Sequence, residues 1–363
     1  MLSRAPANPY SFPVSVKLLS DLIQVLNCIR GVIVAGKKCV IGVDVGATWS
    51  RVASYDISSL AVEIDREPTD VSSSKAVSDQ IVRMVRSVAT EGGFGLASIM
   101  GICIASAGPL SMKEGALMKP PNLPFDYVPL VDPVAKQLKA PTYLVRDSIA
   151  GVFGEKKFGA GKETSNLCYV TISTGLGGGA IVDDHLLFGK DGNAAEIGHY
   201  IVDSKGRLVC GCGRRGHWEA YCSGKNIPRY VDLRLRETEI ESVKRSVLCE
   251  ETNGTISFVS GEALFKAARK GDELSNKFVG ELGIFNAIGF GNVVNSYDPE
   301  LVTVGGAVAL KNPELILNPV QEHVGEYAIN MIPEIRITPL KENVVVYGSI
   351  AFAVDQVSKG KSD

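Results

Sequence analysis

The chain has 363 residues, of which 45% are apolar and 21% are charged, and its formal net charge is −2. This composition is ordinary for a globular protein with one large domain or two smaller ones. A near-neutral chain lacks the basic surface of a nucleic-acid binder, and no apolar run reaches the ~18 residues that cross a bilayer. The eight cysteines are scattered, so we expect free thiols and a cytoplasmic location rather than a disulfide framework.

The predicted elements begin after an N-terminal extension, residues 1–37, in which positions 15–29 carry apolar residues at helical spacing. Residues 38–57 indicate a buried strand, a glycine turn and a second strand. Further strands are expected over 100–106, 141–145, 166–173, 178–182, 186–188, 301–304 and 344–347, and helices over 76–91, from 147 onward, and over 261–270, 276–296 and 348–357. Hairpins followed by alternating strands and helices occur twice, which favours an α/β protein of two similar halves.

Three of the strands run into glycine-rich turns, at residues 44–48, 173–179 and 305–307. Glycine lets backbone N–H groups approach a phosphate closely, and a neighbouring threonine hydroxyl adds a donor. Asp44 in the first turn offers oxygen ligands to Mg²⁺. A single turn of this kind is commonly a tight turn that binds nothing, so the indication of a phosphate site comes from the set of three. The sequence around them matches neither a P-loop nor a Rossmann fingerprint.

A metal site is indicated by His199, Cys210, Cys212 and His217. Two thiolates and two imidazoles are a normal tetrahedral ligand set for structural Zn²⁺. A redox pair or a metal-free loop are the weaker alternatives. Cys222 lies five residues beyond His217; it is either a substitute fourth ligand or, as we favour, a buried thiol.

The combination of the glycine stretch 172–181, GNAAEIGH (192–199) and CGCGRRGHWE (210–219) resembles the ROK family of sugar kinases and repressors, within the actin/Hsp70/hexokinase superfamily. The resemblance implies a two-domain, actin-like (ribonuclease H-like) α/β fold with an interdomain cleft. The expected domains are a small one, 38–148 plus the C-terminal helix 348–363, and a large one, 149–347, with a zinc loop at 199–217.

The resemblance also implies the roles of single residues. Asp147 falls at the catalytic base, which suits the chemistry because a sugar hydroxyl must lose its proton as it attacks the γ-phosphate of ATP. From the residues alone, Asp147 is equally well explained as a helix N-cap. The sugar-binding positions are Gly108, Asn122, Arg146, Asp147, Glu196, His199 and Glu219, and the ATP-binding positions are Asp44, Gly46, Thr48, Thr174, Gly175, Gly305 and Gly306.

Two positions depart from the family pattern. Arg146 stands where the family usually has an asparagine that contacts sugar, and arginine cannot accept a hydrogen bond. The sugar contacts therefore differ, or Arg146 pairs with phosphate. His217 replaces the third cysteine of the zinc motif, and because imidazole is a good Zn²⁺ ligand we expect zinc to be retained.

The expected activity is therefore ATP-dependent phosphorylation of a hexose at the 6-hydroxyl, as in a glucokinase, with Mg²⁺ and a structural Zn²⁺. The alternatives are a kinase for an N-acetylated hexosamine and a sugar-sensing repressor. The repressor is disfavoured because only 37 residues precede Lys38 and few of them are basic. We expect no nucleic-acid or membrane partner, and by analogy with the family a homodimer or homotetramer.

Overall fold

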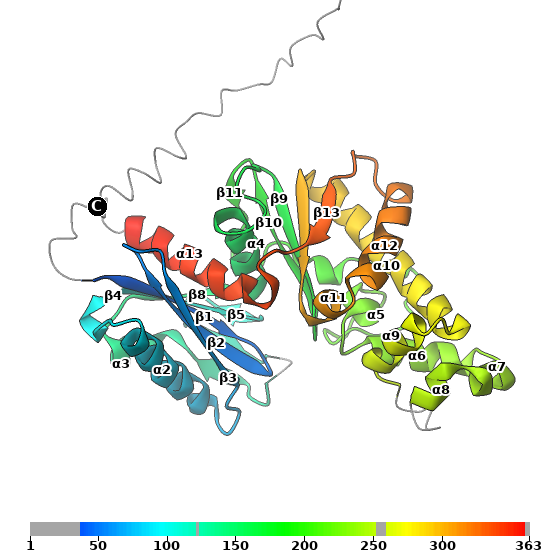
Figure 1. The fold of residues 1–363 in the computed structure, drawn as a ribbon, viewed down its shortest axis with the longest axis horizontal. Helices are drawn as coiled ribbons and strands as arrows, with labels where there is room; N and C mark the ends of the chain where they lie inside the picture. The colour runs from blue at the N-terminus through cyan, green and yellow to red at the C-terminus, as the bar shows by residue number, and fades with distance from the viewer. Residues whose placement is uncertain (1–36, 121–122, 252–258, 360–363) are drawn as a thin grey trace, which may run out of the picture.

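The computed structural model describes residues 37–120, 123–251 and 259–359, and it contains two five-stranded sheets with the same topology (Figure 1). The first has the order β3-β2-β1-β4-β8, with strands Cys39–Val45 (β1), Trp49–Asp56 (β2), Val62–Pro68 (β3), Ile99–Ser106 (β4) and Thr142–Arg146 (β8). The second has the order β11-β10-β9-β12-β13, with strands Leu167–Ile172 (β9), Leu176–Val182 (β10), His185–Leu186 (β11), Leu301–Gly305 (β12) and Glu334–Ile337 (β13). In each sheet three antiparallel strands are followed by two parallel ones. The predicted duplication of an α/β half is confirmed.

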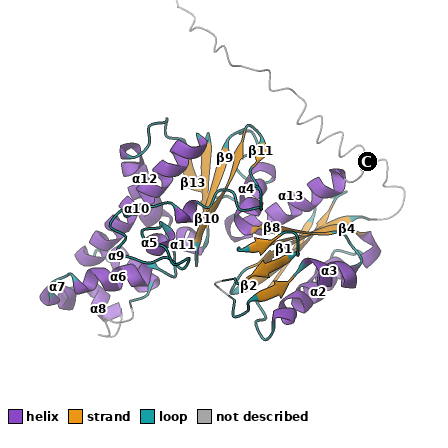
Figure 2. Ribbon diagram, turned by 180° about the vertical axis from the view of Figure 1, so that it is seen from behind, coloured by secondary structure: helices purple, strands orange, loops and turns teal. Residues whose placement is uncertain are grey.

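The first sheet is covered on both faces, which explains why every residue of β1 is buried. Ile41 and its odd-numbered neighbours pack on α2 (Ser74–Glu91) and α3 (Val131–Leu138), whereas Val40 packs on α13 (Val344–Lys359). Figure 2 shows the sheet between these two layers. Three short strands form a separate small sheet beside it: Leu110–Ser111 (β5), Ala116–Met118 (β6) and Tyr127–Pro129 (β7).

The second half carries a larger helical part. Its longest helix, α10 (Glu273–Tyr297), begins where the Asp272 side chain accepts a hydrogen bond from the N–H of Ser275 and ends at Asp298 in the left-handed region. The remaining helices are Glu219–Cys222 (α5), Ile227–Arg236 (α6), Ile240–Arg245 (α7), Val247–Glu251 (α8), Gly261–Arg269 (α9), Ala307–Lys311 (α11) and Pro313–His323 (α12).

Two crossing helices connect the halves. Helix α4 (Asp147–Lys157) leaves the first sheet at β8, and its Val152 packs with Leu167 of the second sheet. Helix α13 crosses α4 at Gly348, where an added Cβ would lie 1.7 Å from the carbonyl oxygen of Ala150. Only glycine permits so close an approach of the two backbones, so this position fixes how the halves meet.

The expected strand over 344–347 is wrong, because these residues form the first turn of α13. The β-branched run Val344–Val346 has local strand propensity. Val344, however, packs with Val152 of α4 and the second sheet, whereas Val346 packs with the first sheet, and this burial selects the helix. The expected helix over 15–29 and Asn122 lie outside the described residues. Among the helices of the described residues, none is long and apolar enough to cross a membrane.

Candidate active site and metal centre

The three glycine turns occupy related places in the two sheets. The turn at Gly46 joins β1 to β2, and the turn at Gly175 joins β9 to β10 in the same way. Gly306 follows β12 and takes a φ of 87°, which brings it against the main chain of Ile172. The side chains of Thr48 and Thr174 are exposed in the first two turns. The sequence-predicted phosphate-binding positions therefore lie at hairpin turns and strand ends.

Asp44 is buried at the end of β1, and its carboxylate pairs with Arg51 of β2 at 3.1 Å. Burial raises the pKa of Asp44 to about 7, the negative charge of Asp147 adds to the rise, and Arg51 opposes it. A buried carboxylate beside a second carboxylate is stabilised in its ionised form by a bound cation. Arg51 was missed from the sequence, since only the antiparallel register, which pairs Asp44 with Arg51, brings it there.

Asp147 is the first residue of α4 and accepts a 2.6 Å hydrogen bond from the N–H of Ser148. Arg146, not Asp147, occupies the N-cap position, so the N-cap explanation of Asp147 does not fit the structure. Burial raises the pKa of Asp147, and the neighbouring Arg146 opposes the rise. Asp44 and Asp147 lie at the same end of the first sheet, because β1 and β8 both run parallel to β4 between them, and the charge of Asp147 accordingly raises the pKa of Asp44.

Glu196 contacts two other predicted site residues. Its Oε1 lies 2.9 Å from Nη1 of Arg146, and its Oε2 lies 3.2 Å from Nδ1 of His199. Arg146 is 5% exposed, whereas Glu196 keeps 43% of its side chain exposed. The carboxylate of Glu196 is therefore both anchored and accessible to a ligand.

The four residues of the predicted metal site come together. The ligand atoms of His199, Cys210, Cys212 and His217 all lie within 4.8 Å of one another. Tetrahedral Zn²⁺ with bonds of about 2.0–2.3 Å holds its ligand atoms about 3.3–3.8 Å apart, so the donor types fit the ion and small side-chain movements would complete the geometry. Nδ1 of His199 rests on Glu196, and a carboxylate on the second ring nitrogen is the usual way a metal-binding histidine is oriented.

Two observations bear on the alternatives at this centre. Cys222 is buried and its thiol contacts the carbonyl of Leu282, so it packs as a core thiol away from the cluster. Cys210 and Cys212 are both free thiols.

Hydrogen bonds with Cys210 and Glu196 raise the pKa of His199 to about 10, because both neighbours favour the positively charged form of its ring.

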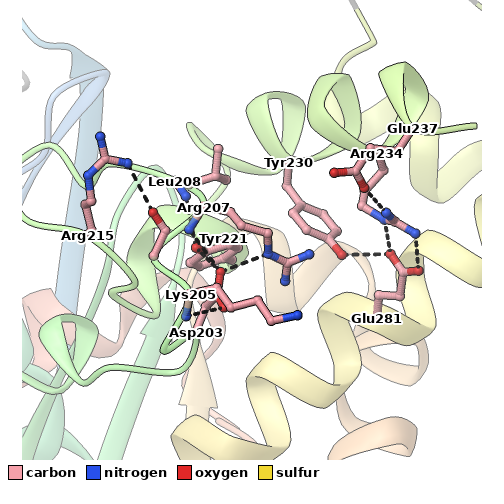
Figure 3. A network of polar contacts seen from close by, with 11 residues as sticks. Asp203, Lys205, Arg207, Leu208, Arg215, Tyr221, Tyr230, Arg234, Glu237 and Glu281 are labelled. Carbon is pink, nitrogen blue, oxygen red and sulfur yellow. Dashed lines mark hydrogen bonds and ion pairs between the residues drawn. The ribbon is translucent and has the colours of Figure 1, made fainter.

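A buried polar network holds the loop between His199 and Cys210 (Figure 3). Asp203 is 7% exposed and accepts hydrogen bonds from the N–H of Lys205, from the N–H and Nε of Arg207, and from the hydroxyl of Tyr221. The same hydroxyl accepts from the N–H of Leu208. Sequence reasoning missed this network because an aspartate in a loop and a tyrosine 18 residues later give no periodic signal.

Glu219 links the loop at 199–217 that carries the predicted metal ligands (the metal loop) to the glycine turn at 173–175. Its Oε2 accepts a 3.0 Å hydrogen bond from the N–H of Leu176, and its Oε1 lies 3.6 Å from the sulfur of Cys210. Both carboxylate oxygens of this predicted sugar ligand therefore have protein partners. The contact places the metal loop and the turn at 173–175 in one rigid unit.

Comparisons with known proteins agree with this arrangement. The ROK family profile matches residues 40–353. A glucokinase of Pyrobaculum calidifontis is 32% identical over 313 residues, covering 86% of this chain and 94% of the relative. A glucokinase of Aeropyrum pernix is 32% identical over 295 residues, covering 80% of this chain and 88% of the relative.

Solved structures agree on the fold. A ROK family glucokinase from Streptomyces griseus, solved with glucose and AMPPNP, superposes with a TM-score of 0.72 at 28% identity. That comparison covers 87% of this chain and 99% of the Streptomyces griseus chain. From the matching family profile, the similarity over nearly the whole length of these relatives and the paired actin-like sheets, the chain belongs to the ROK family.

Proposed function

We propose that the protein is an ATP-dependent hexose kinase that phosphorylates the 6-hydroxyl of glucose or a closely related hexose. The observation that carries the proposal is the position of Asp147. It lies beside Arg146, which pairs with Glu196 of the sugar-binding motif, and it influences Asp44 of the first phosphate turn electrostatically. A proton acceptor between a sugar-binding group and a phosphate-binding turn is the arrangement that phosphoryl transfer to a sugar requires.

Each of the predicted site residues then has a defined role. Glu196 binds sugar hydroxyls, and His199 orients the Glu196 carboxylate through Nδ1 while its other ring nitrogen is left for zinc. Asp147 takes the proton of the attacking hydroxyl at its carboxylate. The turns at Gly46, Gly175 and Gly306 hold the phosphates and the adenosine of ATP through backbone N–H groups. Asp44 is the residue that would hold Mg²⁺, which neutralises phosphate charge when bound.

The zinc ion would be held by His199, Cys210, Cys212 and His217, where its role is structural. These ligands fix the loop that carries His199, while the carboxylate of Glu219 is held by the N–H of Leu176. We infer that the centre shapes the sugar-binding surface and takes no part in proton transfer.

The test is an assay of ADP release with ATP, Mg²⁺ and a panel of hexoses, including N-acetylated hexosamines, on the wild type and on Asp147→Asn. The variant keeps the shape of the side chain and removes the base, so turnover should fall by at least about a hundredfold while sugar binding persists. Asp132→Asn, an exposed aspartate of α3, is the matched control. Turnover of Asp147→Asn within a few-fold of wild type would remove Asp147 from the mechanism.

The proposed domains are the two sheet-centred halves, with α13 returning to the first. We place the protein in the cytoplasm, in keeping with the buried free thiols of Cys39, Cys103, Cys168 and Cys222.

We further propose a homo-oligomer. Ile201, Ile329 and Met331 are 63%, 92% and 91% exposed. The segments that carry them are tied to the C-terminal turns of α10, through Tyr200 to Ser296 and through the N–H of Ile329 to Asn295. Exposed apolar residues gathered in this way are typical of an interface. Light scattering of the wild type and of a variant with Ile329→Ser and Met331→Ser tests it, and a monomeric wild type refutes it.

A further inference from the structure

Arg146 is a buried guanidinium directly before the proposed base. Its side chain is 5% exposed, and its Nη1 lies 2.9 Å from Oε1 of Glu196 and 3.2 Å from the carbonyl oxygen of Ala194. These contacts hold the outer end of the guanidinium on the sugar-binding motif at 192–199. The position of the rest of the group is thereby fixed.

Among the residues that the structure describes, the Nε of Arg146 has no hydrogen-bond partner although it is buried. Buried donors are nearly always paired, because an unpaired one loses its hydrogen bond to water without replacement. An orphaned N–H on a buried side chain that is anchored at Nη1 therefore points to an acceptor that arrives with the ligand.

The space in front of this donor is beside Gly108, one of the positions implied for sugar binding. A Cβ built on Gly108 would have two heavy atoms within 4 Å apart from its chain neighbours, namely the backbone nitrogen of Leu110 at 3.7 Å and Nε of Arg146 at 3.8 Å. Both are nitrogen atoms that carry hydrogen. The absent side chain of Gly108 thus leaves a small space whose nearest described atoms, apart from the chain neighbours of Gly108, are these two N–H-bearing nitrogens.

We propose that Arg146 is a specificity-determining residue whose Nε, together with the Gly108 corner, binds an oxygen of the sugar that serves solely as a hydrogen-bond acceptor. The inference rests on the proposed hexose kinase function. An asparagine at this position both donates and accepts, whereas arginine only donates. The sugar oxygen is either a ring hydroxyl whose proton is directed elsewhere or the carbonyl of an N-acetyl group.

Paired sugar analogues distinguish an accepted from a donated hydrogen bond. A deoxy sugar lacks the oxygen, whereas a deoxyfluoro sugar keeps a weak acceptor and cannot donate. We expect one ring position at which deoxygenation lowers kcat/KM by about ten- to a hundredfold, mainly through KM, and at which fluorine restores part of the loss. If the acceptor is an acyl carbonyl, the N-acetyl compound instead exceeds its parent hexose by a similar factor.

The variant Arg146→Lys assigns the contact. Lysine keeps a positive charge for Glu196 but places no donor at the Nε position, so the penalty at that one ring position should vanish while those at other positions remain. Arg83→Lys, which alters an exposed pair with Glu67, is the matched control. Thermal denaturation of each variant verifies that it is folded.

Calorimetric binding of the same sugars keeps this inference separate from the kinase proposal, because it reports the contact even without turnover. The inference is overturned if wild type and Arg146→Lys rank the deoxy and deoxyfluoro sugars identically. It is equally overturned if no analogue pair in the wild type separates the loss of an oxygen from the loss of its proton.

Discussion

Replacing Asp203 by asparagine tests whether the network of Figure 3 positions the metal loop. The carboxylate accepts four hydrogen bonds, two from backbone N–H groups, one from Arg207 and one from Tyr221. Asparagine offers one acceptor oxygen and turns an N–H₂ group toward donors. Hydrogen bonds to a charged group contribute roughly 1.5–3 kcal/mol each. Because the remaining acceptor oxygen of asparagine keeps some of the four bonds, we expect the free energy of unfolding to fall by about 2–4 kcal/mol.

The functional consequence should exceed a loss of stability. The loop from 200 to 209 joins two metal ligands, so a loosened loop should lower bound zinc, measured by mass spectrometry of the metal, and raise the hexose KM. The value of kcat at saturating sugar should change little, since Asp147 is untouched. Asp232→Asn, which removes an exposed pair with Arg236, is the control and should change stability by less than about 1 kcal/mol.

The same network predicts a pH dependence. Burial raises the pKa of Asp203, but the hydrogen bonds from Tyr221 and Arg207 outweigh it, so the pKa lies below the usual value. A carboxylate with a lowered pKa contributes stability above its unfolded pKa of about 3.9, and the contribution disappears as pH falls further. The wild type and Asp203→Asn should therefore differ most at neutral pH and converge in acid. If Asp203→Asn loses stability but keeps normal zinc content and KM, the network supports the fold and does not position the site.

Three further predictions concern the helix crossing, the first phosphate turn and the metal ligands. Gly348→Ala should lower the free energy of unfolding by at least about 1–3 kcal/mol, because the added Cβ meets the backbone of α4. Gly280→Ala, on open helix surface, should instead raise the free energy of unfolding by up to about 1 kcal/mol. Equal effects of the two variants in denaturant titrations would contradict the close crossing. Asp44→Asn should abolish Mg²⁺-dependent turnover. It should also raise the melting temperature more at pH 8 than at pH 5, because a pKa raised to about 7 means that ionising the buried carboxylate lowers the stability of the wild type increasingly as pH rises. A gain in melting temperature that is independent of pH would refute this. Cys210→Ser should lose zinc and sugar affinity together, whereas the control Cys222→Ser should keep both. A zinc-free Cys210→Ser variant with unchanged sugar affinity would show that sugar binding does not depend on the metal.

Several elements were predictable because their signals are local. The buried run before Asp44 and the glycines that follow it define a strand and a turn within about ten residues, and β1 and β2 lie where the pattern indicates. The long apolar periodicity of 276–296 likewise gives α10. The Cys/His cluster proposed to bind a metal was predictable as a cluster because four residues of the right chemistry fall in one window of 19 positions.

Other features depend on contacts that no local pattern encodes. The run Val344–Val346 has the propensity of a strand, but Val344 packs on α4 and the second sheet and Val346 on the first sheet, and this burial makes the run a helix. Arg51 reaches Asp44 through strand register, and Tyr221 reaches Asp203 through the path of a loop. In each case the deciding energy comes from groups far apart in the chain.

The sequence by itself determined the α/β class, the duplicated halves, the glycine turns and the cluster of two cysteines and two histidines, because these follow from periodicity and residue chemistry along short stretches of chain. The tertiary structure alone decided how Glu196 is shared between Arg146 and His199, how Glu219 is engaged by Leu176 and Cys210, and which donor of Arg146 is left unpaired. The physical reason is that hydrogen-bond partners and burial are properties of neighbours in space, and those neighbours exist only once the two sheets and their crossing helices have packed.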